Sequence, residues 1–181
     1  EMDAETQTML ENAIEFLDGE MVKYYDRRAL KDKDYQPSWT DLHMTYARSF
    51  WLNDFALKGK AKTTYNSILK SIRNKWTELE ASQKGLAAVV LNRSGYATDA
   101  KKIMVSLRET ALTSEEFGTY WNMDKGYYWY QAPIENHVMI LEAFHEVEKD
   151  VDMVREMNIW LLKQKQTQSW ETTKATAEAC Y

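Results

Sequence analysis

Apolar residues recur every three or four positions along most of this chain, which is the spacing that places side chains on one face of an α-helix. The last helix begins near Thr172 or Thr173, where a hydroxyl can cap free N–H groups. The seven earlier apolar stripes cover residues 9–25, 39–50, 65–79, 86–91, 100–107, 134–144 and 151–161. Because short connections join these helices, the pattern is typical of stacked αα-hairpins. The predicted fold class is therefore all-α, in a single helical domain over residues 1–181.

The ends of several helices are also predicted. Residues 86–91 are apolar nearly all round, so this helix should be an inner one covered on every side. Gly95 follows it and is able to take the left-handed conformation that ends helices. Thr98 and Asp99 are expected to cap the next helix. Pro133 suits the first turn of the helix over 134–144.

An aromatic segment over residues 117–130 interrupts the helical pattern. Its aromatic residues flank an Asp124–Lys125–Gly126 turn, which predicts a short β-hairpin inserted in the helical fold. Tyr and Trp side chains can stack on a sugar or a peptide, and they are also enriched in cores and interfaces. We favour a core or an interface. The candidate interaction surface consists of Tyr120, Trp121, Tyr127, Tyr128, Trp129 and Tyr130.

Composition narrows the function classes. The 181 residues include 2 Pro and 6 Gly against 18 Trp and Tyr, which suits long helices around a core of large side chains. A net charge of −5 gives no support for binding nucleic acid or an anionic membrane. No apolar run approaches the length of about 20 residues that crosses a bilayer. The single Cys180 excludes an internal disulfide framework.

Two segments near the end of the chain, considered together, resemble a known family. Residues 132–144 form an acidic, aliphatic-rich helix, and residues 160–179 contain a Trp-Leu-Leu-Lys-Gln-Lys helix, a Gln-Ser-Trp turn and a Thr-Thr-Lys-Ala-Thr helix start. Both resemble the end of the helical thioester-type domain of alpha-2-macroglobulins. Residues 87–95 and 103–111 are similar to the bacterial, envelope-associated branch, so the resemblance spans about residues 40–181. The residues that carry the family motif are Glu135, Trp160, Gln164, Trp170, Thr172, Thr173 and Thr176.

This resemblance implies a fold and a function. The fold would be a partial α/α toroid of about four αα-hairpins, which is a fragment of a larger domain. The function would be that of a structural and interaction domain in a bacterial endopeptidase inhibitor, located in the periplasm or cell envelope. In that family a protease cuts a bait region elsewhere in the chain and is trapped by the resulting rearrangement. The partners would be other domains of the same chain and target proteases, with no cofactor.

The resemblance also implies which chemistry is missing. The family builds its thioester from a Cys-x-Glu-Gln motif, which does not occur in this segment, and Cys180 is followed only by Tyr181. We therefore name no catalytic residue and expect Cys180 to be a small residue packed on the last helix. A truncated toroid exposes the faces that the missing helix pairs would cover, so we expect self-association through those faces.

The three histidines are candidate metal ligands or catalytic groups. Glu142 and His145 have the Glu-x-x-His spacing of di-iron bundles, but the second copy of the motif is missing, so a solvated helix face is expected. His137 lies about two helical turns from His145 and would need to face the same way to add a ligand. His43 is expected to be a structural histidine, hydrogen-bonded at the edge of the core. No metal site is predicted.

An alternative function is an α/α-toroid domain that binds or hydrolyses glycans with the aromatic segment. Glycoside hydrolysis needs two carboxylates facing the sugar. The carboxylates near the aromatic segment are Glu115, Glu116, Asp124 and Glu135. The Asn92–Arg93–Ser94 tripeptide also matches the pattern for N-glycosylation, which matters only in a eukaryotic secreted protein.

Overall fold

The computed structural model describes residues 3–29, 34–123, 132–167, 170 and 172–181. Within these residues the all-α fold class is confirmed, since the structure is helical apart from one two-stranded sheet. The α-helices are α1 (Ala4–Ala29), α2 (Trp39–Ser49), α3 (Gly59–Lys75), α4 (Ala81–Arg93), α5 (Ala97–Glu109), α6 (Pro133–Ala143), α7 (Val151–Thr167) and α8 (Thr173–Cys180). A 3₁₀ turn, η1 (Trp76–Glu78), follows α3, and a π-helical turn, η2 (Phe144–Glu148), follows α6.

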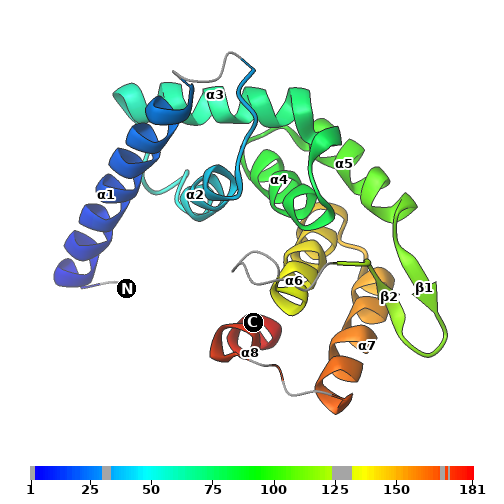
Figure 1. Ribbon diagram of the computed structural model, residues 1–181. Helices are drawn as coiled ribbons and strands as arrows, with labels where there is room; N and C mark the ends of the chain where they lie inside the picture. Colours follow the sequence, from blue (N-terminus) through cyan, green and yellow to red (C-terminus); the bar gives the residue numbers. More distant parts are fainter. Residues whose placement is uncertain (1–2, 30–33, 124–131, 168–169, 171) are drawn as a thin grey trace.

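The helices form an arc with two layers (Figure 1). Helices α1, α3, α5 and α7 lie along the outside of the arc, and α2, α4, α6 and α8 lie along the inside. The inner helices contact one another in order, because α2 packs on α4, α4 on α6 and α6 on α8. Helix pairs therefore follow one another around the arc. The toroid itself stays a prediction, because the arc of described helices is open.

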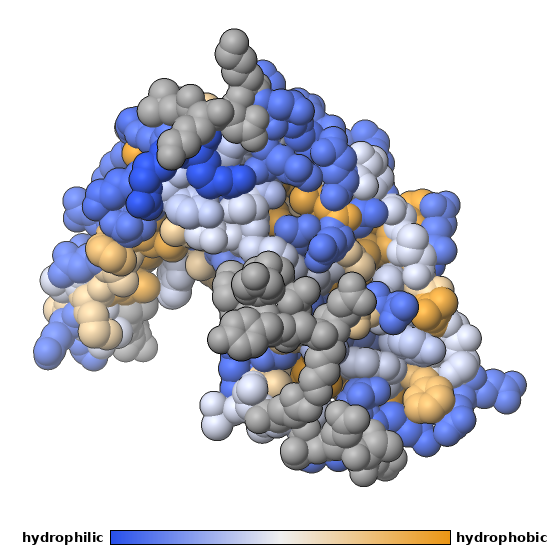
Figure 2. Space-filling model, viewed as in Figure 1, coloured by the Kyte–Doolittle hydropathy of each residue, from blue (hydrophilic) through white to orange (hydrophobic). Residues whose placement is uncertain are grey.

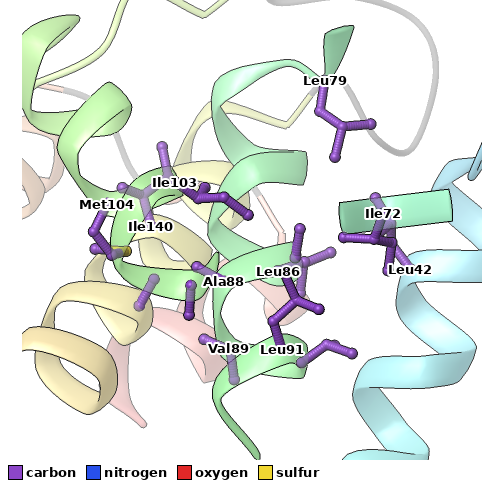
Figure 3. Close-up of a cluster of buried hydrophobic side chains, with 14 of the residues drawn as sticks. Leu42, Ile72, Leu79, Leu86, Ala88, Val89, Leu91, Ile103, Met104 and Ile140 are labelled. Carbon is purple, nitrogen blue, oxygen red and sulfur yellow. The ribbon is translucent and has the colours of Figure 1, made fainter. Parts of the chain in front are cut away.

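Helix α4 is the centre of the core. Every residue from Gly85 to Leu91 is buried, as expected for a helix that is apolar all round. Apolar side chains from α2, α3, α5 and α6 surround it (Figure 3). Gly85 lets α6 approach closely, since a Cβ atom there would lie 3.0 Å from the Met139 carbonyl oxygen. Gly95 ends the helical segment with a φ of 86°, as predicted.

The predicted helix starts are confirmed in two of three cases. Pro133 is the first residue of α6, and the Thr172 hydroxyl accepts a hydrogen bond from the Ala175 N–H of α8 at 3.0 Å. The predicted cap at Thr98 and Asp99 is wrong. Helix α5 already begins at Ala97, because the turn at Gly95 lets the Tyr96 N–H bond the Leu91 carbonyl at 2.8 Å, and the chain enters the helix from there.

A β-hairpin begins before the segment in which one was predicted. Strand β1 (Leu112–Ser114) pairs antiparallel with β2 (Gly118–Tyr120), so the turn falls at residues 115–117. The predicted turn at 124–126 lies outside the described residues. Gly118 has a φ of 65°, and a Cβ atom there would collide with the Glu156 carbonyl oxygen of α7. The strand pairing is therefore fixed by a turn and a helix contact that only glycine permits.

Candidate functional site

Two adjoining pockets line the inner face of the arc, where α2, α6, η2 and α8 converge. Glu142 and Tyr181 line both of them. One pocket has a volume of about 590 Å³, and Arg93, His145, Glu146, Lys149 and Val151 complete its lining. The other has a volume of about 430 Å³ and is completed by His43, Tyr46, Val138, Met139, Lys174, Ala177 and Glu178. The two pockets together form the concave surface that we consider the candidate functional site.

Arg93 is the centre of this surface. Its Nε lies 3.0 Å from both carboxylate oxygens of Glu146, and its Nη2 donates to Glu142 Oε1 at 2.9 Å. Its Nη1 donates to the Ser49 hydroxyl at 3.2 Å, and its guanidinium lies 4.0 Å from the centre of the Phe50 ring. One side chain thus connects the end of α4 with α2, α6 and η2. The other carboxylate oxygen of Glu142 accepts a hydrogen bond from the Tyr46 hydroxyl at 2.6 Å.

These contacts determine the charge states in the site. Burial alone would lower the pKa of Arg93, but the hydrogen bonds and negative charges of Glu146 and Glu142 outweigh burial and raise it. Burial and the hydrogen bond to Glu142 raise the pKa of the Tyr46 hydroxyl. Arg93 is therefore permanently cationic and Tyr46 neutral. Glu142 has both oxygens bound and is poorly placed to act as a base.

The pocket beside α8 has a different character. Burial lowers the pKa of His43, whose Nδ1–H donates to the Trp39 carbonyl at 3.0 Å. Burial raises the pKa of the Glu178 carboxyl despite the opposing charge of Lys174, whose Nζ lies 3.6 Å away. His43 therefore matches the structural histidine expected at the edge of the core. The site presents apolar walls and paired charges, which suits packing against another protein surface.

The two described aromatics of the predicted interaction surface both pack within the domain. Trp121 is only 4% exposed, and its Nε1–H donates to the Leu107 carbonyl at 3.0 Å, so it belongs to the core and not to a surface. Tyr120 stacks on Trp160 with ring centres 6.4 Å apart. Tyr127, Tyr128, Trp129 and Tyr130 lie outside the described residues.

The carboxylates of the glycosidase alternative do not meet beneath Tyr120 and Trp121 in the described part of the chain. Glu115 and Glu116 are exposed at the hairpin turn, whereas Glu135 is buried on α6. Asp124 lies outside the described residues. A pocket of about 290 Å³ adjoins Trp121, and its lining of Ala81, Lys84, Thr110, Leu112 and Asn122 contains no carboxylate.

The family-motif residues gather where α6, α7 and α8 meet. Trp160 of α7 lies against His137 of α6 with ring centres 4.4 Å apart, and the Lys165 ammonium lies 4.8 Å from the centre of the Trp170 ring. Thr172 caps α8, and the Thr176 hydroxyl donates to the Thr172 carbonyl at 3.1 Å. The remaining motif residues are Glu135, buried on α6, Gln164, half-buried on α7, and Thr173, exposed at the start of α8. Of these contacts, the one between Trp160 and His137 joins two helices, whereas the threonine contacts are local to α8.

The exposure and contacts of the histidines, Glu142 and Cys180 test the remaining expectations. His145 is exposed, as expected for a solvated face, but the expectation for Glu142 is wrong because Arg93 and Tyr46 bind it. Cys180 is exposed, so the expected packing is also wrong. Helix α8 buries Ala175, and five further residues turn the Cys180 side chain about 140° away from that face. His137 is fully buried, and burial lowers its pKa to about 4.

Two arginines in the structure were not identified from the sequence. Arg93 lies within the tripeptide that matches the glycosylation pattern, where Ser94 is hydrogen-bonded to the Tyr65 hydroxyl at 3.0 Å. Arg48 is fully buried and donates to Asp18 of α1 at 2.8 Å and to the Phe55 carbonyl at 2.6 Å. The sequence did contain one sign of both residues. Each arginine lies beside the apolar stripe of its helix, and a cation in that position is expected to have a partner in the fold.

No family model matches the chain, and no curated protein or solved structure matches it significantly. Among the described residues, no group of three or more His, Cys, Asp or Glu side chains is placed to hold a metal ion. In the same part of the chain, no helix combines the length and the apolar character that spanning a membrane requires.

Proposed function

We propose that this chain is a structural and interaction module of a bacterial alpha-2-macroglobulin-like endopeptidase inhibitor. The observation that supports this most is the arc of helix pairs, in which α6 contacts both α7 and α8, Trp160 of α7 packs on His137 of α6, and Thr172 caps α8. Residues that hold consecutive helix pairs together are what a toroid fragment requires. On this proposal the other domains of the natural protein and the trapped protease are its partners, in the periplasm or cell envelope.

The packing suits a part that moves as a unit. Arg48 joins α1 to α2 and the segment after it, Arg93 joins α2, α4, α6 and η2, and Arg108 binds Glu148 and Asp150 across the turn before α7. Arg48 and Arg93 are largely buried, so removing a partner of either leaves a charge poorly solvated, and their contacts resist bending of the arc. A stiff arc with a concave, mixed apolar and charged face can pass the effect of bait cleavage to the surrounding domains. On this proposal its role is positioning.

The proposal is tested by protease trapping in the natural protein that carries this chain. The protein is mixed with an active protease, and hydrolysis of a small peptide substrate and of a large protein substrate is then followed. We expect cleavage of the small substrate to continue while cleavage of the large one stops. The control is the same protease with its active site covalently blocked, which cannot cut a bait and should not be retained. Undiminished digestion of the large substrate would overturn the proposal.

A further inference from the structure

An exposed apolar stripe follows the first half of α1. Met9 is 68% and Phe16 is 71% exposed, and Ala13 lies between them on the same face. The buried residues of α1 are Ile14 and Met21, which point about 130° away from this stripe. The carboxylates of Glu5 and Glu20 lie beyond its two ends, and Glu20 also pairs with Lys23 at 2.8 Å on the surface. The stripe is therefore an apolar centre with a carboxylate at each end, and nothing in the described chain covers it.

Helix α7 carries a stripe of the opposite charge. Val151 is 77% and Leu162 is 58% exposed, and they lie on the same face of the helix. Arg155 is on that face too, and its side chain is 69% exposed although it pairs with Asp152 at 3.3 Å. Lys165 adjoins the other side of Leu162. This stripe consists of Val151, Arg155, Leu162 and Lys165. Leu162 lies between the two cations, and Val151 at the end of the stripe also lines the pocket of about 590 Å³.

The two stripes lie at opposite ends of the outer layer, as Figure 1 shows for α1 and α7. In Figure 2, apolar residues are visible over the lower part of α1, which stands apart from the rest of the molecule. The charge at this end is uniform. Residues 1–22 contain seven carboxylates and no Lys or Arg. Such a face would be repelled by an anionic membrane and attracted by a basic protein surface.

We propose that the stripe on α1 pairs with the stripe on α7 of a second copy of this chain. In a two-fold dimer each α1 meets the partner's α7, so both stripes of both copies are covered and the two arcs meet end to end. Along a helix axis, Met9 and Phe16 are about 10 Å apart and Glu5 and Glu20 about 22 Å apart. With Leu162 seated between Met9 and Phe16, Arg155 extends about 10 Å to one side and Lys165 about 5 Å to the other. Both cations then lie within side-chain reach of a carboxylate.

This inference does not depend on the inhibitor function, because it concerns the surface of the isolated chain. The first measurement is the mass of the 181-residue chain by light scattering after size-exclusion chromatography, over a wide range of concentration. We expect a dimer, with twice the 21.3 kDa of one chain. Phe16→Glu and Leu162→Glu should each weaken dimerisation at least about tenfold by placing a charge in the apolar centre. Val105→Glu on α5 changes an exposed apolar residue outside both stripes and should leave the dimer intact.

Charge reversal gives a second, independent measurement. One variant carries Glu5→Lys with Glu20→Lys, and the other carries Arg155→Glu with Lys165→Glu. Each variant should be monomeric alone, because like charges then face one another. An equal mixture of the two should form a heterodimer, since every reversed stripe meets its complement. A monomeric wild-type chain at all concentrations, or folded variants that dimerise as wild type does, would overturn the proposal. A mixture that stays monomeric would overturn it as well.

Discussion

At the scale of single residues, paired arginines hold this helical domain together. Arg93 binds two carboxylates and a hydroxyl and packs on two aromatic rings, and its side chain is only 16% exposed. A cation removed from water to this extent is tolerated only when partners replace its hydration. Glu142 and Glu146 depend on it in return. Arg93 therefore sets the relative position of three inner elements.

Replacing Arg93 tests this role. We expect Arg93→Ala to lower the free energy of unfolding by about 2–4 kcal/mol, because Glu142 and Glu146 lose their cation in a poorly solvated place. Lys60→Ala, which removes an exposed ion pair with Asp26, should cost less than about 1 kcal/mol. Urea unfolding of both variants and of wild type measures the difference. Equal losses for the two variants would show that the Arg93 contacts add nothing beyond a surface pair.

His137 gives the domain a sensitivity to acid. Burial lowers its pKa to about 4 from an ordinary 6.5, so the unfolded chain binds a proton more readily than the folded one. The folded state therefore loses stability as pH falls below about 6.5. The loss attributable to His137 reaches about 2 kcal/mol at pH 5 and roughly 3 kcal/mol below pH 4.

The variant His137→Gln removes the titrating group. We expect it to be less stable than wild type at pH 7, because the ring packs against Trp160, but to lose less stability between pH 7 and pH 5. Unfolding in urea at the two pH values gives both differences. Equal pH dependence in the variant and in wild type would mean that His137 is protonated with little cost in the folded protein.

At the scale of elements, sequence predicts the helices better than their connections. The stripes that predicted α1, α2 and α7 depend on contacts within one helix face, which a periodic pattern records directly. The hairpin at residues 112–120 was not predicted, because its pairing depends on Gly118 fitting against α7. The start of α5 was missed for a similar reason, since a turn at Gly95 and not a side-chain cap begins it. Long-range backbone contacts such as these cannot be predicted from the pattern of neighbouring residues.

Two glycine substitutions distinguish a glycine required by a long-range contact from one that only lowers helix propensity. Gly118→Ala should destabilise the domain by about 2 kcal/mol or more, because its φ is positive and a Cβ atom would collide with α7. Gly19→Ala lies within α1 with nothing near its Cβ position, and it should stabilise by about 0.5–1 kcal/mol. Thermal unfolding should therefore shift in opposite directions for the two variants. A Gly118→Ala protein as stable as wild type would show that β2 does not pack closely on α7.

At the scale of the whole molecule, the order of the inner helices and the pockets between them come from the structure alone. The sequence indicated helix pairs, but it contained no sign that Glu142 and Arg93, 49 positions apart, would meet. The sequence also placed Trp121 in a candidate interaction surface, but its side chain is buried in the core. The candidate site is thus built from residues of α2, α4, α6 and α8, which only the arc brings together. On the proposed function, this arc is one stiff part of a larger protein.

The most direct test of that account is a pair of structures of the natural protein that carries this chain, before and after a protease cleaves it. We predict that α2, α4, α6 and α8 keep their mutual packing and the Arg93 contacts in both states. The whole helical unit should change position relative to the neighbouring domains. Contradiction would come from a unit that does not move on cleavage, or from a pocket beneath Tyr120 in which two carboxylates face a bound sugar.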